Sequence, residues 1–213
     1  METEANLTDY VALNSSQEEA ERDPFTPWRY RQFARYLAPD AVAVLDVGCA
    51  TGRGGRSLKE VRPDISIRGL DCLADRLARL PKDIYDEGVC SFTTNIDAAE
   101  NSYDAIVAGE FIEHLSYRDG LQTLDEFKRI LKPGGQLMMT TPYPDYLRLV
   151  LTGGDTMGGA HVSAHYPKQL KVMMENAGFC SIRFLPSGSM TRLLSDRLPF
   201  LWLYGSFLII GNA

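Results

Sequence analysis

Short apolar runs of strand length alternate, from residue 41 onward, with stretches whose apolar residues recur at helical spacing. Runs such as "AVAVLDVG" at 41–48 and "YDAIVAG" at 103–109 carry apolar residues at consecutive positions rather than at every second one. A strand with this pattern is buried on both faces, which is typical of a parallel sheet covered by helices. The pattern therefore predicts an α/β fold.

The boundaries of the predicted elements are marked by proline and glycine. Pro63 and Pro81 each follow a helical pattern, and the glycines of "KPGG", at 132–135, favour a left-handed helix C-cap there. An irregular, glycine-rich segment, 151–166, precedes a later helix. We expect strands at 41–48, 65–71, 89–94, 103–109, 135–142, 181–187 and 206–213, and helices at 28–38, 53–61, 72–80, 117–131, 167–179 and 190–198.

The length of the chain indicates one domain. With 213 residues, of which 45% are apolar and 23% charged, the chain can bury one sizeable core. Residues 27–213 are therefore expected to form a single domain. Residues 1–26 include the acidic run "SQEEAERD" and show no sustained period, so we expect a flexible N-terminal arm.

Charge and cysteine content argue against several functions. A net charge of −6 makes nucleic acid an unlikely partner, because binding its phosphates requires Lys and Arg. The four cysteines contain no C-x-x-C pair, which fits a reduced, cytoplasmic protein better than a disulfide framework. The longest apolar stretch, 198–211, is interrupted and shorter than the roughly 20 residues of a transmembrane helix, although it leaves room for peripheral membrane contact.

A glycine-rich loop, "VLDVGCATGRGG", joins the first strand to the first helix that follows it. Its spacing, Gly48-x-Ala50-x-Gly52, departs from the G-x-G-x-x-G fingerprint, so a cofactor without a pyrophosphate is favoured. Asp71 ends the second strand, where a carboxylate can accept both hydrogen bonds of a ribose diol. The alternative is that Asp71 only caps the next helix.

Four segments together resemble class I S-adenosylmethionine-dependent methyltransferases: "VLDVGCATG", "GLD", "YDAIVAGEFIEHL" and "FKRILKPGGQLMMTTP". The resemblance covers roughly residues 40–185 and is closest in style to ubiquinone-pathway and polysaccharide-type O-methyltransferases. It implies a Rossmann-like, seven-stranded, mostly parallel sheet with helices on both faces. The last strand, 206–213, is then expected to run antiparallel between its two neighbours.

The same resemblance implies which residues contact S-adenosylmethionine. Asp71 would bind the ribose, Cys72 would lie against the adenine, and Glu110 would line the pocket. Asn95, with Ile96 beside it, would meet the adenine amino group, and Asp97 competes for that role. The methionine part would be held by Asp46, Gly48, Cys49, Ala50 and Gly52.

The stretch "GEFIEHL" permits three interpretations. Glu110 and Glu113 can simply favour the first turn of a helix through its dipole. His114 can act as a general base, because imidazole titrates near neutral pH and this segment ends the fourth strand. Glu110, Glu113 and His114 can also share one helical face and bind Mg²⁺, Mn²⁺ or Zn²⁺.

A fourth metal ligand is implied by resemblance. The segment "HVSAHYPKQLKVMMENAGF" is similar to one in quinone-precursor and polysaccharide-type O-methyltransferases, and His161 matches its recurring histidine. Together with E-x-x-E-H it resembles the metal site of small-RNA 3′-end methyltransferases. His161 is thus a second catalytic or metal-binding candidate.

The combined prediction is a methyltransferase that acts on oxygen in a small-molecule or glycan acceptor, which is phenolic, sugar-based or lipid-linked. The alternatives are a non-catalytic S-adenosylmethionine-binding regulatory protein and a metal-dependent RNA 3′-end methyltransferase. A nicotinamide-dependent oxidoreductase is disfavoured because the G-x-G-x-x-G fingerprint is missing.

Overall fold

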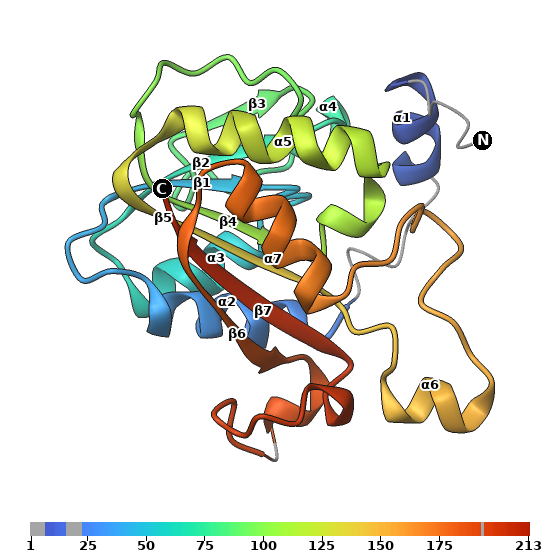
Figure 1. Ribbon diagram of the computed structural model, residues 1–213. Coiled ribbons are helices and arrows are strands. Elements are labelled where there is room, and N and C mark those ends of the chain that lie inside the picture. The colour runs from blue at the N-terminus through green and yellow to red at the C-terminus, as the bar shows by residue number, and fades with distance from the viewer. Residues whose placement is uncertain (1–6, 16–22, 193) are drawn as a thin grey trace.

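The computed structural model describes residues 7–15, 23–192 and 194–213, which build a seven-stranded sheet with helices on both faces (Figure 1). The strand order is β3-β2-β1-β4-β5-β7-β6. The strands are β1 (Ala43–Val47), β2 (Ser66–Asp71), β3 (Glu87–Cys90), β4 (Tyr103–Gly109), β5 (Leu131–Pro142), β6 (Cys180–Ser187) and β7 (Ser206–Asn212).

The helices lie in two layers and one peripheral group. The α-helices are α1 (Leu7–Ser15), α2 (Thr26–Tyr36), α3 (Arg53–Val61), α4 (Ala74–Leu77), α5 (Tyr117–Ile130), α6 (Leu147–Thr152) and α7 (Pro167–Asn176). Single 3₁₀ turns are η2 (Ile112–His114), η3 (Ser189–Arg192) and η4 (Leu201–Leu203). In Figure 1, α5 and α7 cover one face of the sheet while α2 and α3 cover the other.

The predicted sheet is confirmed in both its class and its last strand. β1 to β5 run parallel to one another, whereas β7 runs antiparallel to β5 and β6 and lies between them. One core forms under α5 and α7, with Phe127 and Leu170 fully buried, and a second forms under α2 and α3, with Phe33 and Leu58 fully buried. Each face of the sheet therefore supports one apolar layer.

Two predicted helices are shorter in the structure. The segment 72–80 forms only the four residues of α4, and the side chain of Leu80, beyond the end of that helix, packs against Gly69 and Gly88. The segment 190–198 contains only the 3₁₀ turn η3 within its described residues. Conversely, helix α6 was not predicted, and only its last two residues fall in the segment 151–166 that we expected to be irregular.

The glycine C-cap predicted at "KPGG" is wrong. Helix α5 ends at Ile130, and Leu131 is already extended and pairs with Tyr103 of β4. The next pair joins Gln136 to Ala105, so residues 132–135 bulge out of the strand, with Gly134 at a φ of 78°. The glycines therefore belong to a bulge in strand β5 and do not form the end of helix α5.

Part of the predicted N-terminal arm is anchored to the domain. Within residues 1–26, α1 places the Tyr10 side chain in the core under α5. The Tyr10 hydroxyl donates to the Asp119 carboxylate and accepts a hydrogen bond from the Ser116 N–H. The rest of the prediction for the arm falls largely on residues 1–6 and 16–22, outside the described residues.

No helix among the described residues has the length and apolar content to cross a membrane.

Candidate active site

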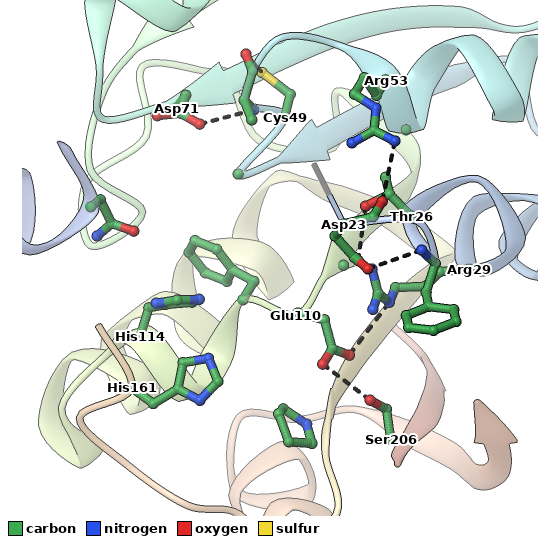
Figure 2. Close-up of a pocket in the computed structure, with 18 of the residues that line it drawn as sticks. Asp23, Thr26, Arg29, Cys49, Arg53, Asp71, Glu110, His114, His161 and Ser206 are labelled. Carbon is green, nitrogen blue, oxygen red and sulfur yellow. Dashed lines mark hydrogen bonds and ion pairs between the residues drawn. The ribbon is translucent and has the colours of Figure 1, made fainter. Parts of the chain in front are cut away.

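A large cavity of about 1320 Å³ opens where β1, β2 and β4 end (Figure 2). Ligands in open α/β sheets bind at this carboxyl edge, where neighbouring strand-helix loops diverge. Helix α1 and the segment that leads into α2 add walls to it, through residues such as Tyr10, Asp23 and Arg29. The site therefore combines the sheet edge with the N-terminal elements.

The glycine-rich loop makes its turn at the cavity wall. Gly48 has a φ of 65°, and a Cβ atom there would lie 3.0 Å from the Phe111 ring. The N–H groups of Gly48 and Cys49 both donate to the Leu70 carbonyl, which ties the loop to β2. Gly48, Cys49 and Ala50, which the resemblance assigns to the cofactor, line the cavity. Gly52 does not, but its φ of 84° lets α3 begin beside them.

Asp71 is hydrogen-bonded to the segment that begins α4 and also lines the cavity. Its two carboxylate oxygens accept N–H groups from Ala50 and from Leu73, each at 2.9 Å, and Leu73 is the N-cap of α4. The side chain also lines the cavity, as does the neighbouring Cys72. Burial raises the pKa of Asp71. Each carboxylate oxygen keeps a second lone pair for a ligand hydroxyl.

Asp46 lies beneath the loop and does not line the cavity. The hydroxyl of Tyr30 donates to one carboxylate oxygen at 2.6 Å, and the hydroxyl of Tyr85 donates to the other. Burial raises the pKa of Asp46 to about 7, against the opposing effect of the two tyrosine hydrogen bonds. Asp46 therefore supports the loop from below, and the cofactor contact expected from the resemblance stays a prediction.

The residues expected at the adenine end lie elsewhere. Asn95 is exposed, and the N–H of the buried Ile96 donates to Glu126 of α5; neither residue lines the cavity. Ser91, Phe92 and Thr93 line it instead. The sequence pattern extended the third strand to residue 94, whereas β3 ends at Cys90, so the residues at the sheet edge were placed four positions too late.

Glu110 lines the cavity, but its charge faces an arginine. The Glu110 carboxylate accepts a hydrogen bond from the Ser206 hydroxyl at 3.0 Å and forms an ion pair with Arg29 Nε at 3.4 Å. The Arg29 guanidinium also pairs with Asp23 at 3.1 Å (Figure 2). The two carboxylates raise the pKa of the buried Arg29 against the lowering effect of burial.

The sequence did not distinguish Arg29 from its neighbours on α2. Arg31 and Arg35 alternate with aromatic residues in the same way, yet they pair with Glu60 and Asp196 respectively. Only the three-dimensional contacts separate a cavity arginine from two surface arginines. Ser206 had no recognisable signal, because it begins the last strand from the far end of the chain.

Glu113, His114 and His161 come together, and Glu110 does not join them. One ligand atom from each of the three residues lies within 4.8 Å of the other two. The predicted sharing of one helical face fails for Glu110, because residue 110 follows β4 with a φ of 51° and only the 3₁₀ turn η2 comes next. The four-residue cluster expected from the sequence therefore divides into a triad and an ion pair.

The two imidazoles are oriented by backbone carbonyl groups. His114 Nδ1 lies 3.1 Å from the Ala160 carbonyl oxygen, and His161 Nδ1 lies 2.7 Å from that of Thr156. A carbonyl only accepts, so each Nδ1 is the donor, and in the neutral form of either ring the lone pair lies on Nε2. The rings meet edge to face with centroids 4.9 Å apart.

Burial sets the charge state of the triad. Burial, followed by repulsion from Glu110, raises the pKa of Glu113 well above its ordinary value. Burial and the neighbouring His161 lower the pKa of His114 to about 4. Neither carboxylate oxygen of Glu113 has a hydrogen-bond partner among the described residues.

Comparison with known proteins identifies the family. A family model described as "Methyltransferase domain" matches residues 14–182. The chain is 34% identical over 109 residues to the mitochondrial ubiquinone biosynthesis O-methyltransferase of Mus musculus, covering 46% of the chain and 28% of that protein. It is 31% identical over 120 residues to the demethylmenaquinone methyltransferase of Thermotoga maritima, covering 56% and 52%. The chain thus spans about half or less of the length of these relatives.

Solved structures show the same fold. A SAM-dependent methyltransferase from Archaeoglobus fulgidus has a TM-score of 0.71 at 18% identity, covering 92% of this chain and 97% of that one. The N-methyltransferase NodS from Bradyrhizobium japonicum, in complex with S-adenosyl-L-homocysteine, has a TM-score of 0.66 at 16% identity and covers 95% and 97%.

The raised pKa of Asp46 predicts a pH-dependent stability. The unfolded Asp has a pKa near 3.8 and the folded one near 7, so the folded state binds the proton more tightly and the free energy of unfolding falls as pH rises from 4 to 7. Asp46→Asn should remove this part of the pH dependence, at most about 4 kcal/mol. Urea unfolding at pH 5 and pH 8 measures it, with the exposed Asp83→Asn as control. Equal pH dependence in wild type and Asp46→Asn would contradict the prediction.

Proposed function

Since this chain belongs to the class I S-adenosylmethionine-dependent methyltransferases, in the family whose model matches residues 14–182, we propose that it transfers the methyl group to a hydroxyl oxygen of a small acceptor. The observation that carries this proposal is the position of His114 and His161 in the cavity, opposite the cofactor loop. In each imidazole Nδ1 faces a backbone carbonyl oxygen, so Nε2 is the ring atom that can receive a proton, and a hydroxyl acceptor needs a group that receives its proton.

The cavity fits the cofactor by the chemistry of its lining. Asp71 supplies carboxylate oxygens at the end of β2 for a ribose diol, beside Cys72 and the Ser91–Thr93 segment. Gly48 has no side chain where the Phe111 ring approaches the loop, so no side chain projects into the cavity from this position. The cofactor would supply an activated methyl group on a sulfonium, and the chain would supply alignment between the loop and Glu110.

Asp71 offers the sharpest test of the cofactor site. Asp71→Ala should weaken S-adenosylhomocysteine binding by about tenfold to a hundredfold, since it removes hydrogen bonds from the ligand to a charged group. Calorimetry measures the affinity. Asp71→Asn keeps the shape of the side chain and guards against misfolding, and the exposed Asp75→Asn on α4 is the matched control. Unchanged affinity in Asp71→Ala and Asp71→Asn would place the ribose elsewhere.

The acceptor atom is tested directly with labelled cofactor. We expect methyl transfer to phenolic or sugar hydroxyl groups, with mass spectrometry and NMR placing the new methyl group on oxygen. His114→Gln should lower kcat more than it raises KM, because the imidazole acts on the reacting proton. Amines, thiols and tRNA belong in the same panel. Transfer only to nitrogen, sulfur or RNA would refute the proposal, as would cofactor binding without transfer to any acceptor.

The triad also supports a second feature, a divalent cation held by Glu113, His114 and His161. Two imidazoles and one carboxylate suit Zn²⁺ or Mn²⁺, and carbonyl groups behind both Nδ1 atoms are the usual outer support of metal-bound histidine. A cation would satisfy the Glu113 oxygens, which have no partner among the described residues. It would increase the acidity of an acceptor hydroxyl group. Glu110 is not among these ligands, because its carboxylate pairs with Arg29.

Titration of the metal-free chain with Zn²⁺, Mn²⁺ and Mg²⁺ checks this feature. We expect one cation for each chain, with affinity reduced about a hundredfold by Glu113→Gln or His161→Ala, since each removes one of three ligands. The exposed Glu175→Gln on α7 controls for the change of charge. If EDTA does not affect methyl transfer and no cation binds, His114 and His161 act without a metal ion.

A further inference from the structure

One buried histidine has no place in the cavity lining. His165 is 1% exposed, lies just before helix α7 and does not line the cavity. Its Nε2 atom lies 2.8 Å from the hydroxyl oxygen of Ser163, which does not line the cavity either. Burial lowers the pKa of His165, and the carbonyl group of Ile112 in η2 acts in the opposite direction. The imidazole therefore contacts η2 and its neighbouring segment from outside the ligand site.

We call residues 158–165 the strap, because they run along η2 from the cavity toward α7. The Glu113 carbonyl oxygen of η2 accepts the N–H groups of Val162 at 2.9 Å and Ser163 at 3.1 Å. The Ser163 hydroxyl oxygen lies 3.5 Å from the same carbonyl oxygen and from that of Ile112. The strap is thus attached to the turn that carries two of the three triad residues.

The strap supplies the third triad residue and the support of the second. His161 belongs to the strap, and the carbonyl oxygen of Ala160 in the strap lies 3.1 Å from His114 Nδ1. Figure 2 shows His114 and His161 next to each other, with ring centroids 4.9 Å apart. A shift of the strap along η2 would displace the His161 ring and the carbonyl group beside His114 together. The geometry of the triad therefore depends on the position of the strap.

The two ends of the strap are held differently. Its first end is a glycine turn, with a φ of 110° at Gly158 and 61° at Gly159, and both residues are exposed. Its other end is the buried His165, which is followed by Tyr166 as the N-cap of α7. An exposed glycine turn restrains the chain weakly, because glycine has the widest choice of backbone conformations and little surface is buried there. The restraint on the strap comes from the His165 end.

We propose that His165 is a positioning residue, which through Ser163 holds the strap against η2 and thereby fixes His161 beside the other two triad residues. This inference rests on the proposed function for the chemistry of the triad. A side chain that keeps a hydrogen-bonding group near the Nε2 position should preserve the role. An apolar side chain should not, because it leaves the Ser163 hydroxyl group without this partner.

Imidazole NMR tests the positioning role without using the reaction. The chain contains three histidines, so in His165→Leu the remaining imidazole signals are those of His114 and His161. At about pH 8, where histidine is normally neutral, we expect both rings of the wild type to be fixed with the proton on Nδ1, which faces a carbonyl oxygen. In His165→Leu we expect the ¹⁵N shifts of both rings to move toward those of exchanging tautomers.

Matched substitutions separate the hydrogen bond from packing. The amide group of Gln can donate or accept near the Nε2 position, so His165→Gln should restore the wild-type signals of His114 and His161. Ser163→Ala removes the other partner and should move these signals in the same direction, which preserves the test if His165→Leu does not fold. Ile65→Val changes a buried residue at the amino end of β2, far from the strap, and should lower stability while both signals stay unchanged.

The kinetic effect should follow the same order of variants. We expect His165→Leu to lower kcat about tenfold or more, since displacement of a reacting group by about 1 Å is costly, with a much smaller change in the KM for S-adenosylmethionine. His165→Gln should recover most of this loss. Thermal unfolding compares the stability of all four variants, so that a loss of fold is recognised.

Four results would overturn the proposal. The first is unchanged His114 and His161 signals in both His165→Leu and Ser163→Ala, and the second is His165→Gln that loses the fixed tautomers as fully as His165→Leu. The third is an equal shift of the signals in Ile65→Val. The fourth is an unchanged kcat in His165→Leu, measured on an acceptor that is methylated on oxygen.

The two proposals fail separately. If the imidazole signals shift as expected while no acceptor is methylated on oxygen, the proposed function is wrong and the positioning role stands. If oxygen is methylated while the signals do not shift in either variant, only the positioning role is wrong.

Discussion

The buried carboxylate of Asp46 is the interaction on which the architecture of the site depends. It receives the hydroxyl of Tyr30 from α2 and that of Tyr85 from the turn before β3, so three distant segments meet under the glycine-rich loop. The Tyr85 hydroxyl in turn accepts the N–H of Gly55 in α3 at 3.0 Å. A carboxylate at the end of a central strand is costly to bury, and the tyrosine hydrogen bonds offset only part of that cost.

The same network explains why α3 begins with glycines. A Cβ atom at Gly54 would lie 2.3 Å from the Tyr30 ring, and one at Gly55 would lie 2.1 Å from the Tyr85 hydroxyl. The glycine run therefore serves the approach of two tyrosines as much as the turn of the loop. In this chain Asp46 supports the loop from below. The cavity above the loop is lined by Asp71 and the Ser91–Thr93 segment.

Local signals made the fold and one half of the site predictable. Asp71 and Gly48 were placed correctly at the cavity because strand, turn and helix patterns adjoin them in the sequence. Asn95 was misplaced because a strand boundary inferred from apolar residues shifts by several positions, and that shift carries a side chain away from the sheet edge. The association of Glu110 with Arg29 and Ser206 depends on contacts across 81 and 96 residues, which no local pattern records.

At the acceptor end of the cavity, burial disfavours the charged forms of the titratable side chains. Glu113 is driven toward its neutral form and His114 is held neutral, so both groups report a site that disfavours isolated charge. Burial acts to lower the pKa of Arg29 as well, but the Glu110 and Asp23 carboxylates raise it. An acceptor that carries an unpaired charge would disturb the pairing of Arg29 with Asp23 and Glu110, whereas a neutral hydroxyl group would not.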